Sequence, residues 1–505
     1  MRREDRRQFL QDLAKAGSSA VLAPRVAVAA GTITIGAALP GQAIAADEHG
    51  TGPKGTPNGQ TKSLAVFASS LRYEDIPAAV LQRARDAITD TVATCTYGAQ
   101  LPWSRIVTAY ARANGSGGIS RILGVSGATA HPPSAALCNG SFAHAFELDN
   151  LTKPNSGSHP GATVFTAGLA VGQDRNVSGR DLITAFVAGV EVMIRIGRAT
   201  RHSQEQHGFH APGTTGPFGA AVVCSKLLGL TAAQTQNALG IAASTASGLL
   251  EFAKSGTGAM VKRLHMGRAS EAGVMAALLA ADGFTGPETA LEGEFGFLKV
   301  FCRDYDMDAL TEGLGQTWLT ETIMMKRYAA HITAHTPVQG TLALKNAHGF
   351  SGDDVEAIDI QAIDRAVRVN NIPQPKDILL AQYSIPFCVA LSLYRNPIDP
   401  RSFDEYAVAD PRIMGLARRV TMRPLPPPDN RSDMTSVVTI KLKDGRSFSE
   451  RTTTFMGTPE QPMTQTQLRE KFLMLTREFG EANMSTMFDR LQSLQDQKSI
   501  EWIGV

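Results

Sequence analysis

The sequence is poor in cysteine, in aromatic residues and in closely spaced metal ligands. Its 505 residues include five cysteines, and aromatic residues make up 6% of the chain. The cysteines form no CxxC pair, and their odd number argues against a disulfide framework. A zinc or iron–sulfur centre is therefore not expected. Single cysteines in apolar surroundings are better explained as small buried residues.

An excess of charge and long apolar runs are also missing. Lysine and arginine outnumber aspartate and glutamate by two, which gives a formal net charge of +2 at pH 7. This balance provides no broad basic surface, so nucleic acid is not an expected partner. Beyond the N-terminal region, the sequence has no apolar stretch long enough for a membrane-spanning helix. Positive charge that matters for function must be local.

Residues 1–46 are predicted to be a twin-arginine export signal rather than part of the fold. Residues 5–10 (DRRQFL) are typical of the motif that the twin-arginine export machinery recognises. A mildly apolar stretch then ends in small residues, which predicts cleavage near Ala45 and a periplasmic mature protein. An amphipathic leader or a disordered tail is the alternative. Residues 47–62 are rich in Gly, Pro and Thr and are predicted to be a linker.

Hydrophobic periodicity predicts the fold. Over residues 63–323 apolar residues recur at helical spacing, and the high Ala and Gly content suits close-packed helices. From about residue 356 alternate residues are apolar, which predicts strands, and Asp444-Gly445 predicts a hairpin turn. Helical spacing returns near the C-terminus. The chain is therefore predicted to be mainly α: a large helical-bundle domain (63–323 and 461–505) with a smaller inserted α+β domain (324–460).

A basic cluster stands at the start of an Ala-rich predicted helix. Lys262 and His265 are three residues apart, so they face the same side of that helix. A fixed positive charge beside a titratable imidazole suits a carboxylate substrate. A solvated surface turn is the alternative, and residue types alone favour it.

Two carboxylates and a histidine follow one another in residues 139–161. Glu147 and Asp149 lie near a predicted helix end, and His159 lies in a Gly-bounded turn. These groups could bind a metal, although no further ligand joins them at a usable spacing. Alternatively, a carboxylate could orient the histidine and fix its tautomer. A histidine before proline is, on its own, more often a turn residue than a catalyst.

Residues 207–216 (HGFHAPGTTG) place glycines and threonines ahead of a predicted helix. A helix N-terminus carries partial positive charge and favours a carboxylate or a phosphate. No Gly-Lys-Ser/Thr follows, so this is not a P-loop. An ordinary capped helix start explains the pattern equally well. Farther along, Tyr383 could simply belong to the core, with its hydroxyl bonded to a neighbour.

Residues 260–290 resemble the signature of the MmgE/PrpD family, which includes 2-methylcitrate dehydratases and cis-aconitate decarboxylases. Four further motifs match in order, so that the resemblance covers residues 64–480 or thereabouts; the motifs are residues 139–161, 207–216, 325–331 and 382–386. In this family Glu147 stands where many members carry Asp. Leu151 or Thr152 stands where several carry a substrate-contacting Thr.

The resemblance implies roles for nine residues. The implied catalytic residues are His159, His210, Lys262 and Tyr383. The implied substrate-binding residues are Glu147, Asp149, His265, Lys326 and His331. Members of this family work without a metal or an organic cofactor, so neither is expected. They commonly pair through the helical domain, so a homodimer is expected as well.

The activity implied is that of a metal-independent lyase acting on a small di- or tricarboxylate. The reaction expected first is dehydration of a 2-methylcitrate-like hydroxy acid, which begins by removal of a proton alpha to a carboxylate. The charge that develops there needs preorganised donors, which lysines and histidines could supply. A dicarboxylate epimerase or isomerase, or a decarboxylase of the same family, is the alternative. An exported carboxylate-binding protein without turnover is a possibility of a different class.

Overall fold

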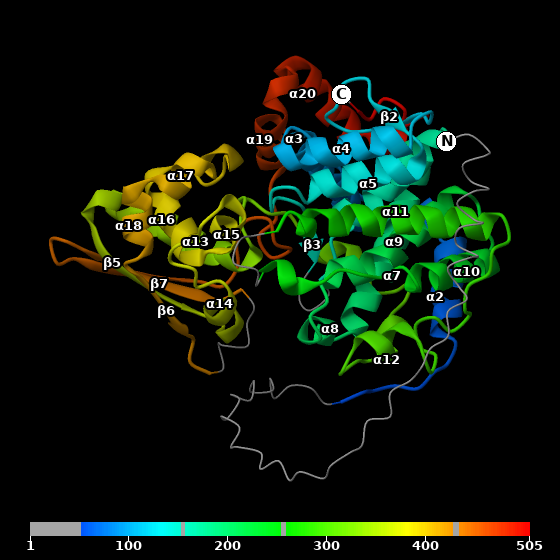
Figure 1. Cartoon of the computed structure of the whole chain (residues 1–505), viewed down its shortest axis with the longest axis horizontal. Helices are drawn as coiled ribbons and strands as arrows, with labels where there is room; N and C mark the ends of the chain where they lie inside the picture. Colours follow the sequence, from blue (N-terminus) through cyan, green and yellow to red (C-terminus); the bar gives the residue numbers. More distant parts are fainter. Residues whose placement is uncertain (1–51, 153–156, 254–258, 428–433, 505) are drawn as a thin grey trace, which may run out of the picture. The chain divides into compact units, whose positions relative to one another are not determined.

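The computed structural model describes residues 52–152, 157–253, 259–427 and 434–504. The predicted export signal, and residues 47–51 of the predicted linker, lie outside these ranges. Helices dominate the described residues, and a small mixed sheet lies in the C-terminal region (Figure 1). The predicted fold class, mainly α with a smaller α+β region, is confirmed. No helix in the described ranges combines the length and the apolarity needed to cross a bilayer.

The N-terminal helices form a closely packed bundle. Their bounds are α2 Gln60–Ser70, α3 Ala78–Gly98, α4 Pro102–Asn114, α5 Pro132–Ala143, α6 Thr166–Asp174, α7 Gly179–Ala199, α8 Ser203–Gln206, α9 Ala211–Leu227, α10 Ala232–Ala243, α11 Val261–Ala281 and α12 Phe297–Phe301. Helix α2 begins inside the segment predicted to be a linker, and the backbone N–H of Lys54 donates to Tyr305 O at 2.9 Å. Part of the predicted linker is therefore hydrogen-bonded to the folded chain, and its last residues belong to a helix.

Small residues let α11 lie against two neighbouring helices. A Cβ added to Gly267 would lie 2.3 Å from Leu137 O on α5, and one added to Gly140 would lie 2.9 Å from the Cα of Gly267. On the α9 side, a Cβ added to Gly273 would lie 2.2 Å from the Cβ of Ala220. These backbones approach so closely that a larger side chain would force them apart. The close packing of helices predicted from the high Ala and Gly content is therefore observed.

The starts of α10 and α9 have local causes. Thr231 caps α10, and its hydroxyl accepts from the backbone N–H of Gln234. Residues 213–216, expected ahead of a helix, instead lie within α9, which begins at Ala211 with His210 at its N-cap. The early start follows from Pro212, which suits a first helical turn, and from burial of this turn.

The sheet of the C-terminal region has the order β6-β5-β7-β8. Its strands are β5 Val355–Ala362, β6 Val420–Pro424, β7 Ser436–Leu442 and β8 Ser447–Thr452. Strand β6 runs parallel to β5, and β7 is antiparallel to both β5 and β8. The predicted alternation is present, with Ile358 and Ile360 buried, and the β7–β8 hairpin turns at Asp444-Gly445, where Gly445 has a φ of 90°.

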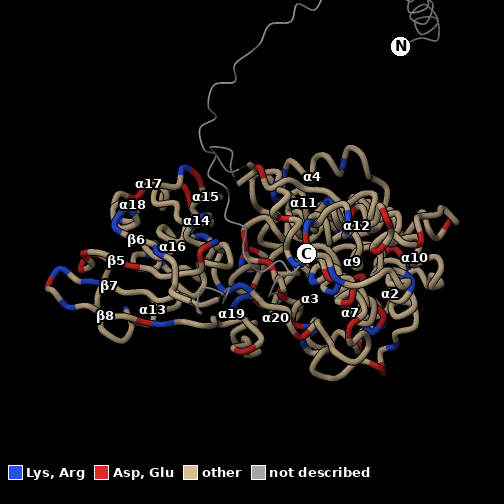
Figure 2. Tube along the Cα trace, turned by 90° about the horizontal axis from the view of Figure 1, so that it is seen from below, with Lys and Arg blue, Asp and Glu red and all other residues tan. Residues whose placement is uncertain are grey.

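Short helices pack around this sheet. Their bounds are α13 His335–His348, α14 Asp364–Val369, α15 Ile378–Tyr383, α16 Ile385–Tyr394, α17 Glu405–Ala409 and α18 Pro411–Ala417. Helix α13 packs against β7 and β8, and α16 packs against α13. Basic and acidic residues are interspersed along the trace, as Figure 2 shows.

The last helices return to the N-terminal bundle. Helices α19 (Gln465–Thr476) and α20 (Glu481–Gln492) pack against α3, and Figure 1 shows them in red beside it. Lys471 Nζ lies 2.5 Å from Asp90 Oδ1 in a buried ion pair between α19 and α3. The division into domains at residues 324 and 460 stays a prediction.

Short antiparallel ladders complete the fold. Strand β1 (Ser120–Arg121) pairs with β2 (Thr129–Ala130), and β3 (Leu151–Thr152) pairs with β4 (Ile323–Met324). In the second ladder Leu151 lies opposite Met324. This pairing brings the residues just before β3 next to those just after β4, although about 170 positions separate them in the sequence.

Candidate active site

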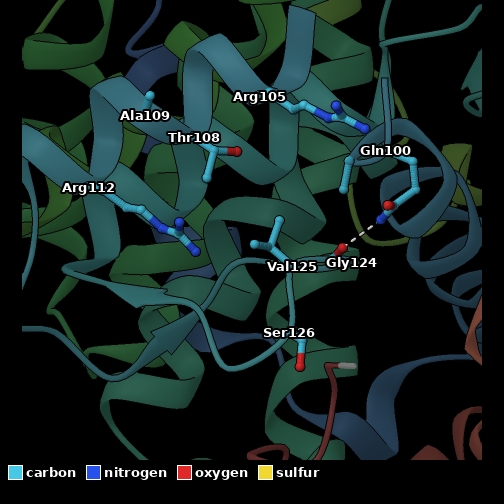
Figure 3. A pocket seen from close by; sticks show the side chains of 9 residues that line it. Gln100, Arg105, Thr108, Ala109, Arg112, Gly124, Val125 and Ser126 are labelled. Carbon is cyan, nitrogen blue, oxygen red and sulfur yellow. Dashed lines mark hydrogen bonds between the residues drawn. The ribbon is translucent and has the colours of Figure 1, made fainter. Parts of the chain in front are cut away.

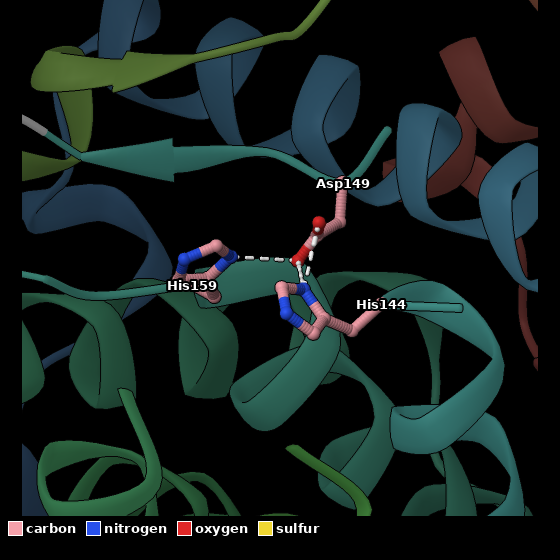
Figure 4. A group of neighbouring side chains, drawn as sticks. All are labelled: His144, Asp149 and His159. Atoms are coloured by element: carbon pink, nitrogen blue, oxygen red, sulfur yellow. Dashed lines mark hydrogen bonds and ion pairs between the residues drawn. The ribbon is translucent and has the colours of Figure 1, made fainter. Parts of the chain in front are cut away.

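Asp149 lies between two histidines in the turn that follows α5. His144 Nδ1 is 3.0 Å from both carboxylate oxygens of Asp149, and His159 Nδ1 is 2.7 Å from Asp149 Oδ2 (Figure 4). All three side chains are buried. Burial opposes ionisation of Asp149, but the two imidazoles outweigh it and hold the pKa of Asp149 well below its ordinary value. The carboxylate is therefore ionised and binds both rings.

These contacts fix the tautomer of His159. An ionised carboxylate can only accept hydrogen bonds, so His159 Nδ1 carries a proton and donates a hydrogen bond to Asp149. The other ring nitrogen, Nε2, is then the position at which His159 can exchange a proton with a substrate. A π-helical turn, η2 (Gly161–Phe165), begins two residues later. Asn150 Oδ1 accepts from the Gly161 N–H at 2.8 Å, which holds this turn in place.

Glu147 bridges two buried lysines. Its Oε2 lies 3.0 Å from Lys326 Nζ, and its Oε1 accepts from Lys262 Nζ. Lys326 follows β4, so the β3–β4 ladder is what brings it beside Glu147. Burial opposes ionisation of Glu147, but the two ammonium groups lower its pKa well below the ordinary value. Glu147 also has a φ of 56°, an uncommon conformation for this residue type, and such strain often marks a functional position.

His144 connects the carboxylate–histidine group to the lysine group. Its Nε2 lies 2.6 Å from Lys262 Nζ, across the close contact between α5 and α11. Burial lowers the pKa of His144 to about 4, with Asp149 opposing the shift and Lys262 adding to it. We call the six buried side chains that these contacts join the ionisable cluster: His144, Glu147, Asp149, His159, Lys262 and Lys326.

His210 and His265 form a second histidine pair beside the ionisable cluster. Their Nδ1 atoms are 3.0 Å apart, and the rings of His144 and His210 have centroids 6.2 Å apart. Burial, together with the charge of Lys262, lowers the pKa of His265 to about 4 and that of His210 well below its ordinary value. Lys262 and His265 are predicted to share one helix face. Lys262 contacts His144 and His265 contacts His210, and the rings of these two histidines are neighbours.

Tyr383 and His331 approach the ionisable cluster from the C-terminal region. The Tyr383 ring centroid lies 5.4 Å from Lys262 Nζ and 4.7 Å from the His331 ring centroid. Gln382, the residue before Tyr383, donates from Nε2 to Phe146 O at 3.0 Å. This bond fixes α15 to the chain just before Glu147. Burial, reinforced by Glu147, raises the pKa of Tyr383 well above its ordinary value, so its hydroxyl stays protonated.

Of the nine residues predicted from the sequence, five belong to the ionisable cluster. His210 and Tyr383 lie beside members of it, and His265 and His331 contact these two residues. The chemical roles of the whole set stay predictions. Sequence reasoning missed His144, although it precedes Glu147 by three positions within the motif at residues 139–161. The signal available was its place among ionisable residues, but its contact with Lys262 depends on how α5 crosses α11.

A metal ion is a poor match for these side chains. His144, Asp149 and His159 offer three donor atoms within 4.8 Å of one another. However, both Nδ1 atoms already donate hydrogen bonds to Asp149, and the Lys262 ammonium lies against His144. A further cation beside that ammonium would be repelled. The donor set fits a hydrogen-bonded chain better than it fits a coordination sphere.

A separate surface pocket of about 350 Å³ lies at α4 and the turn that follows β1. Gln100 Nε2 donates to Gly124 O at 2.6 Å there, and Arg105 and Arg112 line the pocket from α4 (Figure 3). No member of the ionisable cluster lines this pocket. It is therefore not part of the candidate active site.

Comparisons with known proteins agree with these observations. The MmgE/PrpD N-terminal domain matches residues 62–310, and the MmgE/PrpD C-terminal domain matches residues 328–497. A cis-aconitate decarboxylase of Aspergillus terreus is 31% identical over 446 residues, which cover 83% of this chain and 89% of that protein. Cis-aconitate decarboxylases of Mus musculus and Homo sapiens are each 28% identical, over 86% of this chain and 91% and 90% of their own lengths.

Proposed function

Because the chain belongs to the MmgE/PrpD family, as a lyase-type enzyme, we propose that it decarboxylates a cis-aconitate-like tricarboxylate without a metal ion. The relatives compared above are named as decarboxylases, which favours this alternative over the dehydration expected first from the sequence. The ionisable cluster supports the same chemistry, because it combines buried ammonium groups with a histidine that can carry a proton.

The reaction needs charge stabilisation and one proton. When CO₂ leaves an unsaturated tricarboxylate, the electron pair of the broken C–C bond forms a new C=C bond. The electrons of the original C=C bond move to the carbon at its other end, away from the departing CO₂, and this carbon then takes a proton. Negative charge accumulates on the conjugated carboxylate during this step, so preorganised cations and hydrogen-bond donors lower the barrier.

Lys262 and Lys326 would supply the cations. Both are buried, where an ammonium group acts more strongly on a nearby anion than it does in water. Glu147 pairs with both ammonium groups before a substrate arrives, and its charge opposes the lowering of the Lys262 pKa by burial. The Tyr383 hydroxyl and the His210–His265 pair would donate hydrogen bonds to the remaining carboxylates.

His159 would deliver the proton. Its Nε2 faces away from Asp149, and the carboxylate of Asp149 stabilises the imidazolium form that a proton donor needs. The observation that carries the proposal is this 2.7 Å contact between His159 and Asp149. It gives His159 a charged partner and a single tautomer, and His159 is the histidine that the family resemblance implies to be catalytic. Dehydration or epimerisation would use the same groups.

The test is a proton NMR assay of the purified protein with cis-aconitate in D₂O. The proposal expects release of CO₂ and one deuterium in the dicarboxylate product. Failure to release CO₂ would reject it. In the same assay, loss of water from a hydroxy acid would identify a dehydratase, and isotope exchange without any loss would identify an epimerase. Saturable binding without turnover would identify a binding protein.

We also propose that the protein acts as a homodimer in the periplasm. The proposal draws on the family resemblance and on the twin-arginine motif of residues 5–10. Light scattering of the purified protein tests the dimer. Fractionation of cells, with N-terminal sequencing of the mature chain, tests export and cleavage near Ala45.

A further inference from the structure

His144 joins two charge systems that would otherwise be separate. One is Glu147 with Lys262 and Lys326, and the other is Asp149 with His159. His144 Nε2 lies 2.6 Å from Lys262 Nζ, and its Nδ1 lies 3.0 Å from the Asp149 carboxylate. The side chain is 1% exposed, so water cannot replace either contact. Both ring nitrogens are thus committed to charged partners.

The partners allow one tautomer of His144. The Asp149 carboxylate can only accept, so Nδ1 carries the proton. The Lys262 ammonium can only donate, so Nε2 carries the lone pair. A neutral ring with its proton on Nδ1 satisfies both contacts, whereas a doubly protonated ring would place a cation against Lys262. Burial lowers the pKa of His144 to about 4, which agrees with a neutral ring at pH 7.

Of the other titratable groups around the ring, the Glu147 carboxylate favours the charged form of His144 and so opposes the effects of burial and Lys262 on its pKa. Glu147 Oε1 lies 3.9 Å from His144 Nε2, but it is bonded to Lys262. The His159 ring stands edge-on to His144, with centroids 5.0 Å apart, and donates to the same carboxylate. The His210 ring lies farther off, at 6.2 Å, and its own pKa is lowered by burial and by Lys262.

We propose that His144 is a positioning residue, which holds Lys262 toward the substrate carboxylate and holds Asp149 toward His159. The inference rests on the proposed function for the roles of Lys262 and His159. His144 would not touch the substrate; it would restrain the direction of an ammonium group on one side and of a carboxylate on the other. Loss of each contact should therefore damage a different kinetic constant.

Two variants separate the contacts. Asparagine places an amide nitrogen at the distance of Nδ1 from the backbone, so His144→Asn keeps a donor for Asp149 and loses the acceptor for Lys262. Glutamine places an amide oxygen at the distance of Nε2, so His144→Gln keeps the acceptor and loses the donor. His348→Phe is the control, because the His348 ring stacks on Phe448 in the C-terminal region and contacts no member of the ionisable cluster.

The kinetic result expected is a split between KM and kcat. His144→Asn should raise KM for cis-aconitate by about 10-fold or more with a smaller effect on kcat, since a hydrogen bond to a charged group contributes about 1.5–3 kcal/mol. His144→Gln should lower kcat by about the same factor with a smaller effect on KM. His348→Phe should leave both constants near their original values. Equal losses in both variants, in step with falling thermal stability, would overturn the proposal, as would unchanged kinetics.

A nitrogen NMR measurement on ¹⁵N-histidine-labelled protein does not depend on turnover. His144 should be neutral at pH 7 with its proton on Nδ1, and His144→Phe assigns the signal. A proton on Nε2, or an imidazolium at pH 7, would overturn the positioning role whatever the substrate. If His144 has the expected tautomer but cis-aconitate is not decarboxylated, the proposed function fails, and the roles given to Lys262 and His159 fail with it.

Discussion

Asp149 accepts a 2.7 Å hydrogen bond from His159 although its own carboxylate is fully buried. A buried carboxylate stays ionised only when nearby groups offset the loss of water, and His144 and His159 do so here. The contact gives His159 one tautomer and a stabilising charge. A mechanism that uses His159 as a proton carrier therefore depends on Asp149.

Replacement of that carboxylate by an amide should lower kcat strongly. In Asp149→Asn the side chain has no charge to stabilise the His159 imidazolium and can favour the wrong tautomer. A loss of about 100-fold or more in kcat is expected, by analogy with carboxylates that orient catalytic histidines. Steady-state kinetics with cis-aconitate measures it. Asp444→Asn, in the exposed β7–β8 turn, is the control, and equal kcat values in both variants would contradict the role of Asp149.

Glu147→Gln should destabilise the protein in a way that a polycarboxylate can reverse. The variant leaves the buried ammonium groups of Lys262 and Lys326 without a carboxylate partner. Removal of one partner from a buried ion pair costs about 3–5 kcal/mol. Urea denaturation should show this loss, and a bound tricarboxylate should raise the Tm of the variant more than that of the original protein. Equal ligand-induced shifts would show that the lysines do not bind the acid.

Stability should fall as the pH is lowered from about 6.5 toward 4. Burial and Lys262 lower the pKa values of His144 and His265 from 6.5 to about 4 in the folded protein. Between these two pH values the unfolded chain binds more protons than the folded chain, so the free energy of unfolding decreases as the pH falls. Urea denaturation at pH 5 and pH 7 measures the difference. His144→Phe should show a smaller difference, and an unchanged one would contradict the assignment.

A methyl group at the α5–α11 contact should disturb the ionisable cluster from a distance. In Gly267→Ala the new Cβ would lie 2.3 Å from Leu137 O, so the two helices must separate. The separation should cost about 1–3 kcal/mol of stability. It should also lengthen the contact between Lys262 and His144 and so raise KM. Gly415→Ala on α18 is the control, because its nearest neighbour would lie 3.9 Å away, and similar effects in both variants would contradict the packing argument.

The fold could be predicted largely from local patterns. Periodic apolar residues indicated the helices and the strands, and Asp444-Gly445 indicated a hairpin. Each of these signals lies within a few residues of the feature that it specifies. The start of α9 was placed too late, because glycines and threonines suggest a loop when their burial is not known.

Most members of the candidate site could be predicted from the sequence, but the contacts between them could not. The motifs held the residues, whereas the contacts between them depend on chain segments far apart in the sequence. Glu147 meets Lys326 because β3 pairs with β4, and His144 meets Lys262 because α5 crosses α11 at glycines. Local sequence carries no signal for either pairing, which is why His144 was missed.

The most direct measurement is CO₂ release from cis-aconitate by the original protein and by His159→Gln, each with and without a metal chelator. The account predicts release by the original protein at a rate that the chelator does not change, and a kcat lower by about 100-fold or more in the variant, which cannot deliver the proton. Loss of activity on chelation would contradict the metal-free mechanism. Full activity of His159→Gln would contradict the assignment of the proton donor.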